Sequence, residues 1–545
     1  MKKTMILKDW DIWYSYSTYF IEETRDLNAI AISLVQSKLC HVVYNSDSLI
    51  WWNDGKEVRE EDVRLNKIGY ESKAKLIFPQ GLNGYPLEGA YQSASMRFFE
   101  LHLFNSLYLE SFSYIRGFLG ACYMKQGERT IALYPQIKLY HNGIIILSFR
   151  VISPGIEYPI DSFIENDVNL FKHNTDSIKV PPEWIQLDTR SIFSQPIKGI
   201  WNRCKTWNFV KEIDSLIATN IENVDEQEFS FKVAPLDLNN KKGSATMNLD
   251  LLKDIVISSL SHVINHTNEG IGFIMKGSGD CKYHIGNYWI GRPSIYILDF
   301  VDQPYKSQEV IDKYKNELGK IMARISGSDS QKFSNFLEKN LRVFDDYSVH
   351  MNEALTLWVY SKKGLNNDKE YYDPNRGHLI YRNQVLVESV DFLYMCHKRQ
   401  IERSSLSIIS YKSILTERSE ILKLDDMIKK VSHFGEINDF YAFANKQFNW
   451  TEIRTQAEEN LKLRAECINE VRNKNVRMFG WLITILFGLF GIPNFAVNVI
   501  KPLWKYVGLW LPKNSELQQL FLVFITGCFI ILLLFGVWKA TVGRK

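Results

Sequence analysis

The stretch Met478–Ile500 reads MFGWLITILFGLFGIPNFAVNVI, and Leu517–Trp538 reads LQQLFLVFITGCFIILLLFGVW. Neither stretch contains Asp, Glu, Lys or Arg. The hydrocarbon core of a bilayer is roughly 30 Å thick, and an α-helix crosses it with about 20 apolar residues. Because backbone polar groups cannot stay unpaired in lipid, we expect each stretch to be a transmembrane helix. The short link Lys501–Glu516 then predicts a two-helix hairpin.

Basic residues beside the two stretches predict the orientation of the hairpin. Three of them precede the first stretch (Arg472, Lys474, Arg477), three follow the second (Lys539, Arg544, Lys545), and three lie between (Lys501, Lys505, Lys513). This distribution favours both termini in the cytoplasm. The N-terminal residues contain no apolar segment typical of a signal peptide, which agrees with a cytoplasmic main domain.

Composition excludes several classes of protein. The seven cysteines are scattered and form no C-x-x-C pair, which indicates reduced thiols rather than a disulfide or zinc framework. The formal net charge of +3 gives no sign of a nucleic-acid surface, and we expect no direct nucleic-acid binding.

The residues before the first stretch exceed what one hydrophobic core usually holds, so several subdomains are expected. Turn signals at Val180-Pro181-Pro182 and Gln303-Pro304 suggest boundaries. We predict an α+β cytoplasmic domain followed by a helical region with a long stalk helix and the hairpin. The predicted regions are 1–180 (mixed α/β), 181–305 (strand-rich α/β), 306–450 (helical), 451–477 (stalk helix), 478–500 and 517–538 (transmembrane helices), 501–516 (external loop) and 539–545 (basic cytoplasmic tail).

Local patterns predict individual elements. Thr130–Tyr140 and Ile144–Ile152 are strand-like and flank an Asn-Gly dipeptide at 142–143, which is typical of a β-hairpin. Asn248–His266 is predicted to be a helix and Ser294–Phe300 a strand.

The later part of the chain shows helical spacing of apolar residues. Helices are predicted at Ser307–Ile325, Asp329–Val343, Val385–Val431 and Glu436–Lys446. Glu452–Met478 contains no Gly or Pro, so the stalk helix and the first predicted transmembrane helix should form one continuous rod.

One seam of this rod carries polar and small residues. Steps of three and four residues, the spacing of a supercoiled bundle, give the pore-lining candidates Asn473, Arg477, Gly480, Thr484, Phe487, Gly491, Asn494 and Asn498, preceded by Glu466 and Glu470. If several copies turned this seam inward, the polar side chains would meet permeating ions, Phe487 would form a hydrophobic gate, and the two glutamates would form cytoplasmic acidic rings. The alternative is that the small residues only allow close helix packing.

This layout resembles the CorA family of pentameric divalent-cation channels. That family ends its first transmembrane helix in a Gly-Met-Asn signature, which is similar to Phe490-Gly491-Ile492-Pro493-Asn494 with one residue too many. The loop Lys501–Glu516 is basic, whereas the family's loop is usually acidic, and a positive mouth repels divalent cations. The resemblance covers about residues 400–545.

The altered signature is similar to that of the CorA-like membrane effectors of type III CRISPR systems. The resemblance implies a homo-oligomer, which is a pentamer in the family, in the bacterial inner membrane. It also implies that a nucleotide second messenger, a conjugate of S-adenosylmethionine with AMP, opens the oligomer and causes ion leak. Its implied partners are further copies of the chain, the lipid bilayer and this ligand. The alternatives are a constitutive transporter of magnesium or another divalent cation, and a membrane-tethered scaffold or enzyme.

No enzyme motif or metal site is predicted. The Gly-Ser-Gly-Asp segment at 277–280 lacks the Lys-Ser/Thr of a phosphate loop, so a turn is the simpler interpretation. His262 and His266 lie four residues apart near Glu269, without an H-E-x-x-H arrangement. Cys396-His397 is adjacent in sequence only, whereas catalytic pairs meet in space.

Ligand-binding candidates come from cations and aromatic residues in strands. Arg150 and Arg292 can grip a phosphate with two hydrogen bonds, and Trp289 can stack on adenine. The alternative is that these are solvated strand arginines and a core tryptophan.

Overall fold

The structure is a computed structural model of the chain. It describes residues 5–20, 26–45, 48–53, 57–62, 64–67, 74–77, 82, 84–105, 108–109, 113–173, 175–181, 229–231, 248–267, 289–327, 332–371, 377–405, 411–429 and 431–542. The chain divides into two compact units, Met1–Asn460 and Leu461–Lys545.

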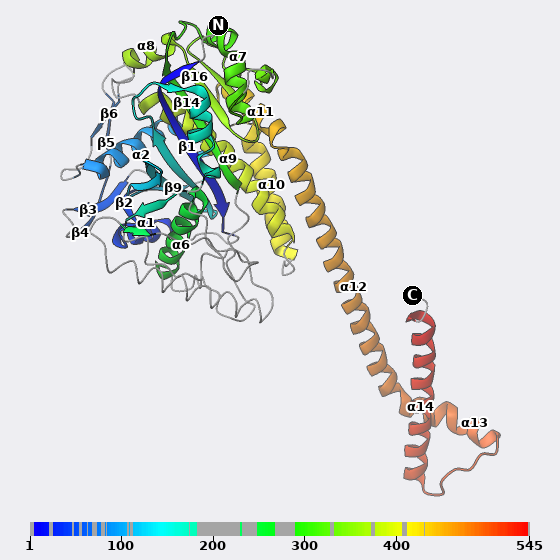
Figure 1. The fold of residues 1–545 in the computed structure, drawn as a ribbon. Helices are drawn as coiled ribbons and strands as arrows, with labels where there is room; N and C mark the ends of the chain where they lie inside the picture. The colour runs from blue at the N-terminus through cyan, green and yellow to red at the C-terminus, as the bar shows by residue number, and fades with distance from the viewer. Residues whose placement is uncertain are drawn as a thin grey trace. The chain divides into compact units, whose positions relative to one another are not determined.

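A large mixed sheet forms the centre of the first unit (Figure 1). Its strands are β1 (Ile6–Tyr19), β2 (Cys40–Asn45), β3 (Ser48–Asn53), β4 (Glu57–Asp62), β7 (Tyr114–Leu119), β8 (Cys122–Gln126), β9 (Arg129–Tyr140), β10 (Ile144–Ile152), β11 (Tyr158–Pro159), β12 (Ser177–Val180), β13 (Phe229–Phe231), β14 (Trp289–Phe300), β15 (Tyr347–Met351) and β16 (Thr356–Tyr360). The main path runs β15-β16-β14-β1-β10-β9-β7-β2-β3-β4, and β5 (Arg64–Lys67) pairs with β6 (Ala74–Ile77) separately.

The helices of the first unit are α1 (Leu27–Gln36), α2 (Gly84–Leu103), α4 (Ile160–Phe163), α6 (Leu249–Thr267), α7 (Ser307–Ala323), α8 (Lys362–Tyr371), α9 (Gly377–Ser405), α10 (Tyr411–Lys429) and α11 (Gly435–Gln447). Helix α12 (Trp450–Phe495) begins in this unit and ends in the second. The second unit also contains a π-helix (Ala496–Ile500), α13 (Lys501–Tyr506) and α14 (Ser515–Val542).

Strand β1 lies inside the sheet, between β14 and β10, and both of its faces are buried. Successive side chains of a strand point to opposite faces. Trp10, Ile12 and Tyr14 join one core cluster with residues of α1, α6 and α7. Trp13 and Tyr19 join a second cluster with residues of α2, α9, α11 and the start of α12. The sheet therefore separates two cores.

Local chemistry explains several element boundaries. The hairpin between β9 and β10 turns at Gly143, whose φ of 85° is readily adopted by glycine. Helix α1 begins after Asp26, whose carboxylate accepts a hydrogen bond from the Ala29 amide at 2.9 Å. The predicted Asn-Gly hairpin is confirmed, and so are the helix at α6, the strand at β14 and helices α7 and α11.

Two strands lie where the sequence indicated only helices. β15 and β16 fall within 306–450, and β16 pairs in parallel with β14. Helix α7 makes the crossover between these parallel strands, as such a connection requires. The helix predicted for Asp329–Val343 is wrong, since its described part holds only a short 3-10 helix at Phe333–Phe336. The long helix predicted for Val385–Val431 is two helices, α9 and α10.

The continuous rod is confirmed as α12, which has 46 residues. The predicted transmembrane hairpin is wrong: among the described residues no helix has both the length and the apolarity needed to cross a bilayer. Helix α12 owes most of its length to the charged residues before Met478, and its apolar part includes Pro493 and gives way to a π-helix at Ala496. Helix α14 begins at Ser515 and carries Glu516, Gln518 and Gln519 in its first turns.

The fold class is therefore corrected to a mixed α and β body built on a large sheet, without the predicted hairpin among the described residues. The absence of charge in two stretches was too weak a criterion, because crossing a bilayer requires sustained apolarity. The predicted membrane and ion-channel character, and the location as a multi-pass protein of the inner membrane, are wrong for the same reason.

The packing of α7 against the 3-10 helix gives a first prediction. A Cβ atom on Gly319 would lie 2.1 Å from the Phe333 carbonyl oxygen. Gly319→Ala should therefore destabilise the protein by about 1–3 kcal/mol through overpacking, measured by urea unfolding. Gly435→Ala is the control, since a Cβ there meets nothing within 4 Å. Equal stability of the two variants would contradict the packing described.

Candidate functional site

A row of basic side chains crosses the sheet on the face that helices α2 and α9 cover. These side chains come from strands β7, β9, β10 and β14: Arg116, Lys138, Arg150 and Arg292. Relative exposure is 1% for Arg116, 4% for Lys138 and 2% for Arg292. A charge buried to this extent requires partners of opposite sign.

Four carboxylates supply that charge. Glu388 and Asp391 come from α9, Glu100 from α2 and Asp11 from β1, and all four are buried. Each of the four cations forms an ion pair with at least one of them. We call these eight side chains the ionic layer; its formal charge is zero.

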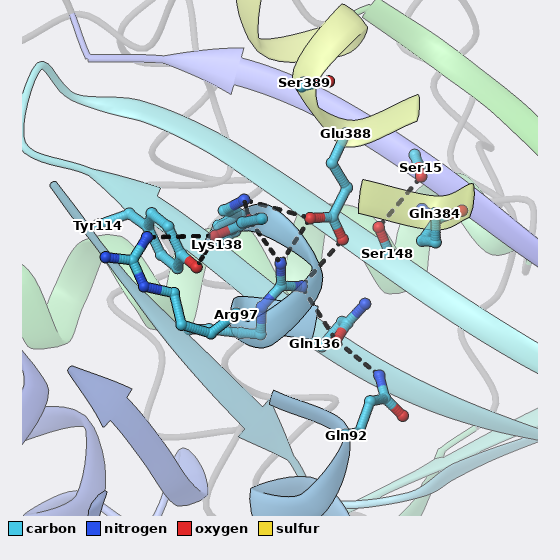
Figure 2. A network of polar contacts seen from close by, with 12 residues as sticks. Ser15, Gln92, Arg97, Tyr114, Gln136, Lys138, Ser148, Gln384, Glu388 and Ser389 are labelled. Carbon is cyan, nitrogen blue, oxygen red and sulfur yellow. Dashed lines mark hydrogen bonds and ion pairs between the residues drawn. The ribbon is translucent and has the colours of Figure 1, made fainter. Parts of the chain in front are cut away.

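The centre of the ionic layer is a bidentate pair between β7 and α9 (Figure 2). Arg116 donates from Nη1 to Glu388 Oε1 at 2.9 Å and from Nη2 to Glu388 Oε2 at 2.6 Å. Lys138 Nζ contacts Glu100 Oε1 at 2.5 Å and Glu388 Oε2 at 3.4 Å. Lys138 thus joins the two helices, with one carboxylate from each.

The environment of Glu100 keeps this carboxylate ionised. Burial raises its pKa, but the combined charges of Lys138, Arg116 and Arg97 outweigh burial, so the pKa of Glu100 lies below its ordinary value. The Tyr114 hydroxyl also donates a hydrogen bond to Glu100. For Lys138, burial outweighs the charges of Glu100 and Glu388, so the pKa of Lys138 lies below its ordinary value.

Neutral polar side chains continue the layer across the sheet. Strand register aligns Gln136 with Ser148 and Ser148 with Ser15, and the two serine hydroxyls lie 3.1 Å apart. Gln92 of α2 donates to Gln136 Oε1 at 2.8 Å. Nε2 of Gln136 is buried and has no hydrogen-bond partner among the described residues. The contact between the helices and this face is therefore polar and incompletely satisfied.

Arg150, predicted from the sequence to bind a ligand, belongs to the ionic layer. Its Nε and Nη2 donate to Asp11 Oδ2 at 2.8 and 2.6 Å, and its Nη1 lies 3.2 Å from the Tyr381 hydroxyl of α9. Burial raises the pKa of Asp11 even though Arg150 opposes the change. Arg150 already holds a carboxylate of its own chain.

Arg292, the second predicted arginine, pairs with α9 in the same way. Its Nη1 lies 3.1 Å from Asp391 Oδ1, and it also donates to the Thr356 hydroxyl. Burial raises the pKa of Asp391 to about 7; Arg292 opposes the rise and the charge of Glu388 adds to it. Trp289 begins β14, but its side chain lies outside the described residues. The ligand-binding roles of these three residues stay predictions.

The seam residues lie on or beyond α12. Most of these residues are exposed: Glu466, Glu470, Asn473, Arg477, Gly480, Thr484, Gly491, Asn494 and Asn498. The Phe487 side chain lies outside the described part. The Thr484 hydroxyl donates to the Gly480 carbonyl of its own helix at 2.8 Å. Their pore-lining roles stay predictions.

The other sequence candidates form no recognisable reaction centre in the described residues. Cys396 and His397 are both buried on α9, and burial raises the pKa of the Cys396 thiol well above its usual range. The described residues contain no group of three or more His, Cys, Asp or Glu side chains suited to a metal ion. The side chains of His262 and His266, the residue Glu269 and segment 277–280 lie outside the described residues.

Sequence reasoning missed six of the eight ionic-layer residues. A usable signal was present, because Arg116 and Lys138 interrupt strongly apolar strands, and Glu388 and Asp391 interrupt an apolar run in α9. Opposite charges at inward positions of buried elements predict pairing. Which cation meets which acid depends on long-range register, which the sequence does not reveal.

A scan against models of protein families, a search of curated proteins and a search of solved structures each find no match to this chain.

The ionic layer predicts a large penalty for removing one partner. Glu388→Gln leaves Arg116 buried without its bidentate carboxylate and should cost about 3–5 kcal/mol of unfolding free energy in urea titrations. Replacing both partners, as Arg116→Met with Glu388→Leu, should recover much of this loss. Glu458→Gln is the control, because Glu458 pairs with Arg454 one turn away on α12 and its side chain is 44% exposed. This substitution should change the unfolding free energy by less than about 0.5 kcal/mol. Additive effects of the two core substitutions would contradict the pairing.

Asp391 predicts a pH dependence. Its pKa of about 7 in the folded protein exceeds the ordinary value of 3.8, so the folded state binds more protons than the unfolded state between these values. Its contribution is therefore fully present at low pH and is lost as pH rises from about 4 to about 7, by up to about 1.4 kcal/mol per pH unit. His350, whose pKa burial lowers to about 4, acts in the opposite sense.

The comparison of wild type with Asp391→Asn therefore isolates the effect, because His350 is common to both. Wild-type stability should fall relative to that of Asp391→Asn as pH rises across this range. A stability difference that stays constant with pH would rule out titration of Asp391.

Proposed function

We propose that this protein is a ligand-responsive regulatory protein in which helix α9 is the element that changes position on the sheet. The observation that carries the proposal is the ionic layer, which places four cations and four carboxylates where helices α2 and α9 meet the sheet. Non-enzymatic action is part of the proposal, as expected from the sequence.

Buried ion pairs favour switching over stability. Apolar residues of equal volume would hold α9 to the sheet at least as strongly, because desolvation offsets much of the attraction between buried charges. Ion pairs instead require particular geometries, so a helix held by them has discrete docked positions. A ligand with different affinities for two such positions shifts the population between them.

Helix α9 connects the ionic layer to the start of α12. The His397 ring lies 6.1 Å from the ring of Trp450, the first residue of α12, and Trp450 is 1% exposed. Farther along, Asn460 Nδ2 lies 3.4 Å from the Ser404 hydroxyl. Any change in α9 therefore acts directly on the base of α12.

The output proposed is association with further copies of this chain through α12. Leu463, Cys467 and Val471 lie four residues apart and hence on one side of the helix, and all three are exposed. Exposed apolar side chains grouped in this way mark interaction sites. The same segment carries both acidic and basic residues, which suits pairing between identical helices.

A nucleotide messenger is the ligand class that the CorA-like resemblance implies, and the conjugate of S-adenosylmethionine with AMP is the first ligand to test. Binding to the full chain should change amide hydrogen exchange in α9 and in the first turns of α12. Glu388→Gln should shift α9 exchange without ligand, whereas Glu458→Gln should not. Failure of this conjugate to bind, or binding with unchanged exchange in α9, would contradict the proposal.

A further inference from the structure

The end of helix α7 carries an arginine in a conformation that such residues seldom adopt. Arg324 follows Ala323 with φ 55° and ψ 39°, the left-handed region that favours glycine. Its amide donates to the Ile321 carbonyl at 2.9 Å and closes the helix. Non-glycine residues held in this region are found disproportionately at functional sites.

The guanidinium of Arg324 has no counterion among the described residues, and two of its nitrogen atoms are buried. Its Nε and Nη2 atoms are buried and have no hydrogen-bond partner in the described part of the chain. The group lies 4.7 Å from the Phe171 ring centroid, on the sheet face opposite α9, where α7 contributes to the first core cluster. Burial lowers the pKa of Arg324 to about 10, so the side chain remains protonated at neutral pH.

The two free atoms form one edge of the guanidinium. Nε–H and Nη2–H point in the same direction, and this edge binds two oxygens of a phosphate or carboxylate at once. Ile325 and Gly327, which follow in the chain, are exposed. The backbone that follows Arg324 therefore reaches the protein surface, while the two guanidinium atoms themselves are buried.

A second arginine contacts the same segment of the chain, since Arg324 contacts Asn169 and Phe171 and Arg129 pairs with Asp167. Arg129 of β9 pairs with Asp167 through Nη2, while its Nη1 is buried without a partner among the described residues. Burial and the charge of Asp167 raise the pKa of Tyr14, and both Arg324 and Arg129 oppose this rise. The two guanidinium groups therefore act on the same hydroxyl. Among the described residues these two arginines have one ion-pair partner between them, Asp167, while Glu165 and Asp161 contact Ser326 and Gly327.

We propose that Arg324 and Arg129 form a binding site for a phosphate group, either free phosphate or the phosphate of a nucleotide. Arg324 supplies the bidentate edge, and Arg129 Nη1 supplies a further donor. A phosphate fits better than a carboxylate because it carries more charge and offers more acceptor oxygens to the two cations. The site would give the proposed regulator a place for its ligand, an assignment that rests on the proposed function.

Charge also connects this site to the ionic layer. Arg292, which holds Asp391 of α9, is one of the charges that lower the pKa of Arg324. An anion bound at Arg324 would reduce the repulsion between these two arginines. We therefore expect an anion at Arg324 to change the electrostatic environment of Arg292 on the side of α9.

The test is thermal unfolding of the full chain with millimolar inorganic phosphate, AMP or acetate at constant ionic strength. Phosphate and AMP should each raise the Tm of wild type by a few degrees, because a ligand that binds only the folded state stabilises it. Acetate should not. Arg324→Gln should lose the shift, and without phosphate it should be at least as stable as wild type, since it removes a charge that has no counterion among the described residues.

Matched variants separate the bidentate edge from simple charge. Arg324→Lys keeps the charge without the planar edge and should retain only a small part of the phosphate shift. Arg454→Gln, at a partly exposed position of α12, should keep the whole phosphate-induced Tm shift. No shift in wild type, an equal shift with acetate, or an unchanged shift in Arg324→Gln would each overturn the site.

Amide exchange on the same samples distinguishes this proposal from the proposed function. An Arg324-dependent Tm shift without any change in α9 supports the phosphate site and counts against the regulatory role of α9. A change in α9 that persists in Arg324→Gln supports the regulatory role and counts against the phosphate site.

Discussion

The bidentate ion pair between Arg116 and Glu388 holds helix α9 to the centre of the sheet. Its two hydrogen bonds of 2.9 and 2.6 Å fix the position of α9 relative to β7. Lys138 extends this connection to α2 by contacting Glu100 and Glu388. Because all of these charges except the partly exposed Arg150 are buried, the arrangement depends on mutual neutralisation. Moving Glu388 would disturb both Arg116 and Lys138.

The two faces of the sheet therefore differ in character. The face covered by α1, α6 and α7 packs mainly apolar side chains, apart from the cluster of Arg129, Asp167 and Arg324, and close-packed apolar side chains adapt little. The face covered by α2 and α9 mixes aromatic side chains with paired charges and aligned amides and hydroxyls. Rearranging a polar contact that already contains an unsatisfied group, such as Gln136 Nε2, costs less free energy. This asymmetry is why we assign the moving part to α9.

Sequence patterns predicted the elements that local chemistry determines. The Asn-Gly turn, helix α6, strand β14 and the uninterrupted helix α12 all follow from residue spacing and turn residues. Strands β15 and β16 were missed because their place in the sheet depends on pairing with β14, far away in sequence. The hairpin was predicted from the length, the apolar residues and the lack of charge of two stretches, although Pro493, Gly and Asn residues lower the apolarity of the first stretch.

The candidate site shows the same limit. Arg150 and Arg292 were predicted to bind a ligand, which stays a prediction, and their carboxylate partners from β1 and α9 were not anticipated. Arg324 carries no sequence signal, because it stands out through a backbone angle and through buried nitrogen atoms that lack a partner in the described part of the chain. Such features arise only from tertiary structure.

Native-state hydrogen exchange at increasing, sub-denaturing urea tests the central claim most directly. If the ionic layer makes α9 a separately movable element, its amides should exchange through an opening that costs less free energy than global unfolding, while those of β1 should require global unfolding. If α9 and β1 exchange with the same free energy and the same urea dependence, α9 is a fixed part of the core and the account is contradicted.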